Sequence, residues 1–157
     1  MADIVDRQTR SRMMAGIRGK DTKPELAIRR ALHARGLRFR LHAKGMAGRP
    51  DLVLRKHRAV IFVHGCYWHR HEGCPFATTP ASRPEFWSEK FLANVRRDLA
   101  VRGTLAGEGW RVAIVWECAL RQAPMVAKVA ALVETWLVSD SCSLEVPERV
   151  RDEIMLA

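Results

Sequence analysis

The sequence contains no hydrophobic run that approaches the roughly twenty residues needed to cross a bilayer. Its first residues, MADIVDRQTRSR, also lack an apolar core followed by a cleavage site. We therefore expect a cytosolic protein that does not act at membranes. Internal repeats and Gly/Ser-rich or acidic tracts are absent as well, so the 157 residues predict one globular unit with a single sizeable core.

Acidic residues are scarce relative to basic ones. The chain has 17 Asp and Glu residues against 27 Lys and Arg, a formal net charge of +10, and the basic residues are scattered along its whole length. Such a field favours a polyanionic partner. Nucleic acid is favoured over a membrane surface because no basic amphipathic anchor stands out. Charge alone leaves open a ribosome-associated protein or a merely basic soluble one.

Cysteine is scarce too, and in a reducing compartment four cysteines are more often metal ligands or buried thiols than disulfides. Cys66, His71 and Cys74 follow the spacing C-x4-H-x2-C, and Cys118 lies just past a predicted strand. If that strand neighbours the one before Cys66, the four side chains can complete a tetrahedral zinc site. The alternative is that Cys66 and Cys118 are ordinary buried thiols and His71 a surface residue.

A zinc ion held by four protein ligands would be structural, because it leaves no position for water. It would pin the loop 65–79, and catalysis would have to come from other residues. The remaining cysteine, Cys142, sits in a polar segment with no partner at ligand spacing, so we expect a free thiol there.

Helical and strand patterns alternate along the chain. Capping boxes at Thr22 and Ser82, each followed by a proline in the first turn, indicate two helix starts. Continuous apolar runs indicate strands that are buried on both faces, and the order of elements predicts an α/β fold with a central mixed β-sheet flanked by helices. The segment after residue 138 carries no clear pattern. The predicted helices cover about 7–18, 22–36, 82–106 and 124–138, and the predicted strands about 52–54, 59–65 and 110–117.

An acidic side chain stands at the mouth of the first predicted strand. Glu25 on a helix, followed by the run Gly48-Arg49-Pro50-Asp51 before buried strands, resembles the PD-(D/E)XK nucleases of restriction and repair. A Pro-Asp pair alone is weak support, because this dipeptide is common in turns. The resemblance implies a restriction-endonuclease-like fold in which Asp51 holds Mg²⁺ against a scissile phosphate.

Several separated motifs narrow this resemblance. They are TRSR near the N-terminus, KDT before the first capping box, the run IFVHGCYWHRH, the helix start EFW and the strand end VWEC. In this order they are similar to the very-short-patch-repair (Vsr) endonucleases over about residues 7–121. The resemblance implies an N-terminal DNA-contacting arm (1–20), an endonuclease domain (21–140) and a C-terminal tail (141–157).

The family resemblance assigns catalytic roles. Asp51 would be the principal Mg²⁺ ligand, helped by the main-chain carbonyl of Val63, since Mg²⁺ prefers oxygen ligands. His69 would be the general base that activates the attacking water, and Asp98 would orient it. The lysine usual in the wider nuclease family is missing, and His69 would take over its role. Two further residues are implied in the outer shell around metal-bound water: Glu25 and His64.

Aromatic residues are implied to read the mismatch. Bases stack on aromatic faces with roughly 1–3 kcal/mol per contact, and a wobble pair is easier to unstack than a matched pair. Trp87 and the polar residues at +3, +7 and +11 from it share one helix face, although the spacing alone also allows Trp87 in the core. The residues implied to contact DNA are Met14, Tyr67, Trp68, Trp87, Lys90 and Asn94.

The resemblance therefore implies a monomeric endonuclease of the bacterial cytoplasm, dependent on Mg²⁺ and stabilised by Zn²⁺. It would nick one strand of double-stranded DNA beside a T:G mismatch that arises from 5-methylcytosine deamination. Mismatch-repair proteins and a companion DNA cytosine methyltransferase would be further partners. Two alternatives stay open: a sequence-specific nicking or restriction enzyme that cuts matched DNA, and a non-catalytic zinc DNA-binding module.

Overall fold

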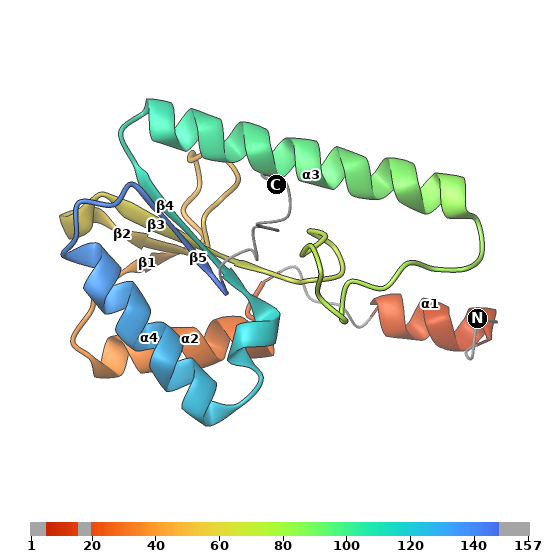
Figure 1. Ribbon diagram of the computed structural model, residues 1–157, viewed down its shortest axis with the longest axis horizontal. Coiled ribbons are helices and arrows are strands. Elements are labelled where there is room, and N and C mark those ends of the chain that lie inside the picture. Colours follow the sequence, from red (N-terminus) through yellow and green to blue (C-terminus); the bar gives the residue numbers. More distant parts are fainter. Residues whose placement is uncertain (1–5, 16–19, 148–157) are drawn as a thin grey trace, which may run out of the picture.

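A five-stranded sheet forms the centre of the computed structural model, which describes residues 6–15 and 20–147 (Figure 1). Its strands lie side by side in chain order. The first three pair antiparallel and the last three pair parallel, which confirms the predicted mixed sheet. The strands are β1 (Arg40–Leu41), β2 (Leu52–Leu54), β3 (Ala59–His64), β4 (Arg111–Trp116) and β5 (Ser143–Val146).

Helices make up most of the remaining regular structure. The first predicted helix is confirmed over Arg7–Ala15, and the rest of its predicted range, residues 16–18, lies outside the described residues. Among the residues that are described, no helix combines the length and apolar character needed to span a membrane. The helices are α1 (Arg7–Ala15), α2 (Lys23–Ala34), α3 (Pro84–Gly107) and α4 (Ala123–Leu137), with short 3-10 helices at Arg55–His57 and Glu117–Leu120.

The helices cover both faces of the sheet (Figure 1). On one face, Ile28 of α2 and Val133 of α4 pack with Ile61 of β3 in a single buried cluster. On the other face, Leu105 of α3 packs with Val60 of β3. Because successive side chains of a strand point to opposite faces, the apolar run of β3 contributes to both cores. The prediction of strands buried on both faces is confirmed.

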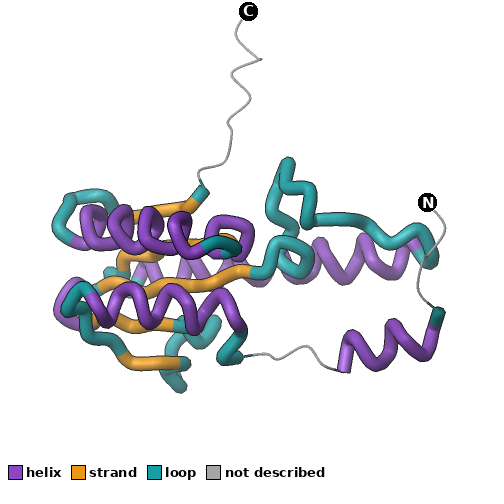
Figure 2. Tube along the Cα trace, turned by 90° about the horizontal axis from the view of Figure 1, so that it is seen from below, coloured by secondary structure: helices purple, strands orange, loops and turns teal. Residues whose placement is uncertain are grey.

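Helix α3 is longer than the sheet that it covers. It has 24 residues, which span about 36 Å at the α-helical rise. Its C-terminal part lies over the sheet, and its N-terminal half extends past the strands beside the loop that follows β3 (Figures 1 and 2). One long helix face is therefore placed opposite the loop 65–79.

Two local predictions are wrong. Ser82 does not cap α3, because Arg83 occupies the cap position in the left-handed region (φ 52°) and no side chain caps the helix. The segment after residue 138 is also more ordered than its sequence indicates, since Ser143–Val146 pairs with β4 as an edge strand. A second edge strand, Arg40–Leu41, was not predicted either. Both edge strands are short and partly polar, and they depend on the hydrogen bonds of their neighbour.

Candidate active site

Asp51 lies at the entry to β2, next to the end of β3. Its Oδ2 accepts a hydrogen bond of 2.7 Å from the main-chain N–H of Val63. Burial raises the pKa of Asp51 to about 6, although the bond from Val63 acts in the opposite direction. Gly48 lets the preceding loop approach α3, because its φ is +69° and a Cβ there would lie 2.5 Å from Val101 Cγ1. The carboxylate is thus fixed through one oxygen, and the other can serve a cation.

Glu25 lines the same site as Asp51 but forms its hydrogen bonds with other residues. Its Oε2 accepts hydrogen bonds from Arg29 Nη2 at 2.8 Å and from the Asp21 N–H at 3.0 Å. His42 lies between the two site carboxylates, with Nδ1 3.7 Å from Asp51 Oδ1 and Nε2 3.7 Å from Glu25 Oε2. Arg29 Nη2 is 2.9 Å from the same Nε2. Asp21 Oδ1 lies 3.4 Å from this nitrogen as well, so Nε2 faces both a donor and acceptors, while Nδ1 faces Asp51.

His42 is therefore a site residue that the sequence did not reveal. It stands in a polar loop, where a solvated histidine is the ordinary expectation. Its place beside Asp51 depends on the packing of the loop against α2, which no local spacing signals.

His69 faces α3 from the loop that follows β3. Its Nδ1 lies 2.7 Å from Asp98 Oδ2. An ionised carboxylate only accepts, so Nδ1 carries the proton, and in the neutral ring Nε2 has the lone pair that a base needs. His64 stacks on His69 with ring centroids 3.9 Å apart and an interplanar angle of 7°. Burial lowers the pKa of His64 to about 3, with a smaller contribution from His69, so His64 is neutral near pH 7.

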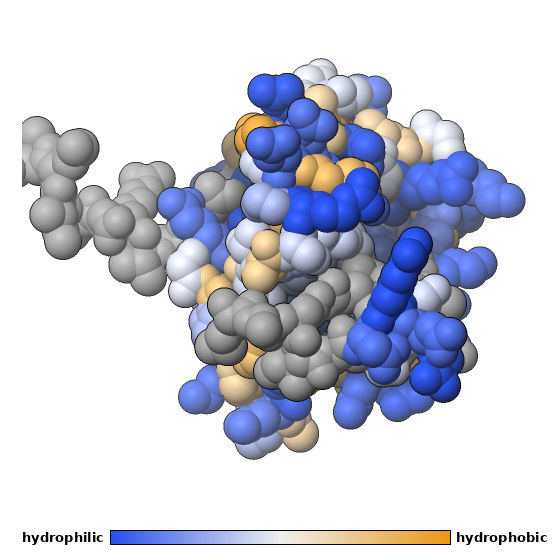
Figure 3. All heavy atoms as spheres, turned by 90° about the vertical axis from the view of Figure 1, so that its right-hand side faces the viewer, coloured by the Kyte–Doolittle hydropathy of each residue, from blue (hydrophilic) through white to orange (hydrophobic). Residues whose placement is uncertain are grey.

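A cavity of about 700 Å³ connects these groups. All five predicted catalytic residues line it, together with Val63 and Asn94. Cationic residues that the sequence did not single out line the cavity too, and such a mixture suits a phosphate backbone held near a cation. The face seen from the overhanging end of α3 is largely hydrophilic (Figure 3). The additional cationic residues of the cavity are Lys20, Arg49, Arg97 and Arg102.

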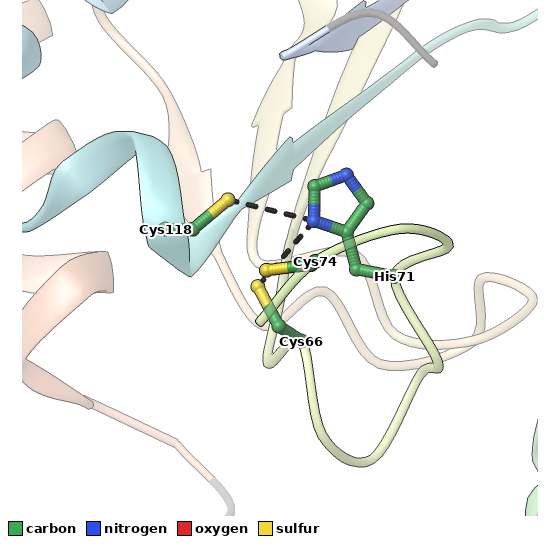
Figure 4. Close-up of side chains that lie close together, drawn as sticks. All are labelled: Cys66, His71, Cys74 and Cys118. Atoms are coloured by element: carbon green, nitrogen blue, oxygen red, sulfur yellow. Dashed lines mark hydrogen bonds between the residues drawn. The ribbon is translucent and has the colours of Figure 1, made fainter. Parts of the chain in front are cut away.

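Four potential metal ligands converge where β3 and β4 end (Figure 4). Cys66, His71 and Cys74 come from the loop after β3, and Cys118 comes from the turn after β4. Their ligand atoms all lie within 4.8 Å of one another. His71 Nδ1 is 3.6 Å from Cys66 Sγ and 3.4 Å from Cys118 Sγ. Parallel pairing brings both strand ends to the same edge of the sheet, so the predicted convergence is confirmed.

This cluster has the dimensions of a four-coordinate metal site. Tetrahedral zinc, with Zn–S near 2.3 Å and Zn–N near 2.0 Å, places sulfur and nitrogen ligands about 3.5 Å apart. Burial raises the pKa of the Cys66 and Cys118 thiols, so a bound cation is needed to hold them as thiolates. Trp116 stacks on His71 at 4.3 Å and fixes the imidazole plane. Cys142 is exposed and outside the cluster, in agreement with a free thiol.

Aromatic side chains gather between the loop 65–79 and the overhanging half of α3. Tyr67 meets Trp68 with ring centroids 5.0 Å apart, and Trp68 meets Trp87 at 6.1 Å. The buried Phe91 lies 5.3 Å from Tyr67 and 5.7 Å from Trp87. Trp87 is only half-buried and is not part of the two cores on the sheet. It belongs to this aromatic cluster instead.

The polar face of α3 is directed at the same loop. Lys90 Nζ lies 5.3 Å from the ring centre of Trp68 and 5.6 Å from that of Trp87. Asn94 Nδ2 donates to the Trp68 carbonyl at 3.1 Å. Asn94 therefore positions the main chain of Trp68, a contact that the sequence did not show, and its reading of a base stays a prediction. Met14 lies on α1, but its side chain is outside the described part of the chain.

Several known proteins are similar in sequence to this chain over most of its length. The sequence profile of the family DNA mismatch endonuclease Vsr matches residues 2–74. The type II nicking enzyme V.XorIIP of Xanthomonas oryzae pv. oryzae is 48% identical over 120 residues, which cover 76% of this chain and 88% of that protein. The DNA mismatch endonuclease Vsr of Escherichia coli K12 is 42% identical over 148 residues, or 93% of this chain and 94% of that protein. The chain belongs to the Vsr family.

A solved nuclease shares the fold of this Vsr-family protein. The catalytic domain of the homing endonuclease I-Bth0305I superimposes with a TM-score of 0.51, over 76% of this chain and 100% of that domain. At 19% identity the likeness supports the fold alone, and it confirms the predicted restriction-endonuclease-like architecture. Family and fold together identify the chain as a DNA endonuclease and favour an enzyme over a non-catalytic binding module.

Proposed function

We propose that this Vsr-family protein is a Mg²⁺-dependent endonuclease that nicks one strand of duplex DNA beside a T:G mismatch left by 5-methylcytosine deamination. One observation carries the proposal. Asp51 and the His69–Asp98 pair line a single cavity, and Asn94 in its wall bonds to Trp68 of the aromatic cluster. Groups suited to cleavage and groups suited to stacking on bases therefore lie side by side.

The residues of the cavity suit hydrolysis of a phosphodiester. Asp51 and the main-chain carbonyl of Val63 would hold Mg²⁺, which when bound supplies Lewis-acid charge to the phosphate. His69 Nε2 takes the proton of the attacking water, while Asp98 holds the other ring nitrogen and stabilises the imidazolium that forms. His64 is neutral and stacked on His69, so it keeps the plane of the base fixed without competing for its proton.

The basic residues of the cavity would hold the DNA backbone. Arg102 lies four residues after Asp98, on the same side of α3, and Arg97 is adjacent to Asp98. Both line the cavity. Together with the net charge of +10, they favour a polyanionic substrate that binds over this cavity.

A structural Zn²⁺ would be held by the cluster of three cysteines and one histidine. Tyr67, Trp68 and His69 lie between two of its ligands, Cys66 and His71. We infer that the zinc fixes the aromatic residues and the base as one unit, because it closes the loop on both sides of them.

A nicking enzyme for matched DNA is the second candidate, since the name of V.XorIIP, a type II nicking enzyme, mentions no mismatch. The aromatic cluster favours mismatch reading instead. Aromatic residues beside the cavity can stack on bases that have left the helix, and a wobble pair opens more easily than a Watson–Crick pair. A companion DNA cytosine methyltransferase would then define the sites where such mismatches arise, and mismatch-repair proteins would be the partners in the repair that follows.

A nicking assay tests the proposal with duplexes that differ only in T:G or C:G at one position. The wild type should nick the T:G duplex alone, and only when Mg²⁺ is present. Mg²⁺ should be omitted rather than chelated, because a chelator would also remove zinc. Asp51→Ala and His69→Ala should bind the T:G duplex and lose at least about a hundredfold in nicking rate, whereas Asp140→Ala, an exposed control, should be unaffected. Equal nicking of both duplexes would support the second candidate.

A further inference from the structure

Arg70 follows the base His69 in sequence, but it is not among the residues that line the cavity with Asp51. Its guanidinium instead binds the main chain at two separate parts of the loop 65–79. Nη1 and Nη2 each donate two hydrogen bonds. The acceptors are the carbonyls of Tyr67 (3.2 Å), Thr78 (2.9 Å) and Ala77 (3.1 Å) and Oγ1 of Thr79 (3.0 Å).

The same guanidinium lies against the aromatic cluster. Its Cζ is 4.0 Å from the ring centre of Phe91 on α3 and 5.8 Å from that of Tyr67. Tyr67 in turn stands edge-on against both Phe91 and Trp68, with interplanar angles of 88°. Arg70 therefore joins two parts of the loop to α3 directly beside the residues proposed to stack on bases.

These contacts leave little of Arg70 for DNA. A guanidinium has five N–H donors, and four hydrogen bonds from the two terminal nitrogens are made within the protein. A bidentate phosphate contact would require some of these bonds to break. The role of Arg70 is therefore to be sought in the loop rather than in backbone binding.

We propose that Arg70 is a positioning residue for mismatch reading, which holds the main chain of Tyr67 and Trp68 in the orientation needed for insertion. This inference rests on the proposed function. A segment that is already ordered loses less conformational freedom when it binds, so a fixed orientation favours insertion. Lysine cannot replace Arg70, because an ammonium group has no planar fork to bridge separate acceptors and stack on Phe91 at the same time.

Two pairs of variants test this role. Arg70→Lys keeps the charge and removes the fork, and Arg96→Lys is its control on an exposed arginine of α3. Thr79→Val removes one acceptor from an exposed position, while Thr78→Val is its control, because Thr78 contributes only its carbonyl. Three quantities are measured: zinc content, affinity for C:G duplex, and the ratio of T:G to C:G affinity.

Arg70→Lys should keep its zinc and its affinity for C:G duplex but lose at least about fivefold in T:G preference, the scale expected for lost hydrogen bonds. Thr79→Val should show a smaller loss of the same kind. The fluorescence of 2-aminopurine placed beside the mismatch should rise less with both variants than with the wild type, and both controls should behave as the wild type. A purely structural role would lower zinc content and C:G affinity together.

An unchanged T:G preference in both Arg70→Lys and Thr79→Val would overturn the inference. If Arg70→Lys loses zinc, Thr79→Val decides the matter, because losing one exposed hydroxyl should leave the zinc site in place. A wild type without T:G preference would instead refute the proposed function. In that case, hydrogen exchange still tests the contacts of Arg70 with the loop, because Arg70→Lys should exchange faster than the wild type in peptides from the loop 65–79. Equal exchange in the two proteins would overturn the inference as well.

Discussion

Asp51→Asn should abolish nicking and make the folded protein more stable. Asparagine keeps an oxygen that can accept the 2.7 Å hydrogen bond from the Val63 N–H, but it has no charge to bury. An aspartate in the unfolded chain titrates near pH 4, whereas burial raises the pKa of Asp51 to about 6 in the folded protein. The folded state therefore binds this proton more tightly than the unfolded state does.

The sign and size of the effect follow from this difference. Well below pH 4 the carboxyl is protonated in both states, so its burial does not lower the stability of the folded protein. Between about pH 4 and pH 6 the stability of the wild type falls as the pH rises, and above pH 6 it stays at the lower value. A pKa difference of about two pH units corresponds to about 3 kcal/mol at pH 7.5. At pH 4.5 it corresponds to only about 1 kcal/mol, because the unfolded chain is then about three-quarters ionised while the folded carboxyl is still protonated. For a chain of this length, 3 kcal/mol raises Tm by about 6–12 °C.

Urea and thermal unfolding of both proteins at pH 7.5 and 4.5 measure this gain, in buffer that contains zinc but no Mg²⁺. Asp140→Asn, which removes an exposed carboxylate, should change stability by less than about 0.5 kcal/mol. Mg²⁺ should raise the midpoint of the wild type but not that of Asp51→Asn. No gain at pH 7.5, or a gain that does not shrink at pH 4.5, would refute the argument that Asp51 is a desolvated carboxylate kept for a cation.

Two further predictions concern the metal cluster and the aromatic cluster. Cys118→Ser should lose about one zinc per chain and much of its thermal stability, whereas Cys142→Ser should keep both. If metal analysis finds no zinc in the wild type or in Cys142→Ser, the assignment of the zinc site is wrong. Trp68→Ala should lose about 5- to 150-fold in preference for T:G over C:G duplex, while Arg12→Ala should weaken binding to both duplexes and reduce the salt dependence. The reverse pattern in affinity titrations at several salt concentrations would show that aromatic stacking does not read the mismatch.

The central part of the fold could be predicted because its residues carry their own signal. The runs of β2, β3 and β4 are apolar on both faces, and proline and capping residues mark the start of α2. The edge strands β1 and β5 carry no such signal, since they are ordered by pairing rather than by an apolar pattern. In β5, Glu145 Oε1 accepts a hydrogen bond of 2.9 Å from Trp116 Nε1 on β4, and a glutamate at that position reads as solvated from sequence alone.

The candidate site also has a part that could be predicted from the sequence and a part that could not. The ligand types Cys66, His71, Cys74 and Cys118 could be grouped because spacing and strand order both point to one sheet edge. The cations of the cavity could not, because they come from segments that meet only in the folded chain. His42 and Arg70 belong with them, since the sequence gives no reason to separate them from the many other basic residues.

The loop 65–79 also bears on where a nick would fall. Trp68 and His69 are adjacent in sequence, and Asn94 and Asp98 hold them from one face of α3. Potential metal ligands of the Cys/His cluster lie on either side of them. If Trp68 stacks on a base and His69 activates the water, the distance between the two would be set by bonded geometry and by two helix contacts. This distance would not vary with a movement of separate segments, because both residues belong to the same loop. We expect cleavage at one fixed number of nucleotides from the mismatch, and scattered cut positions in Cys118→Ser or Asn94→Ala products on a sequencing gel wherever residual activity remains.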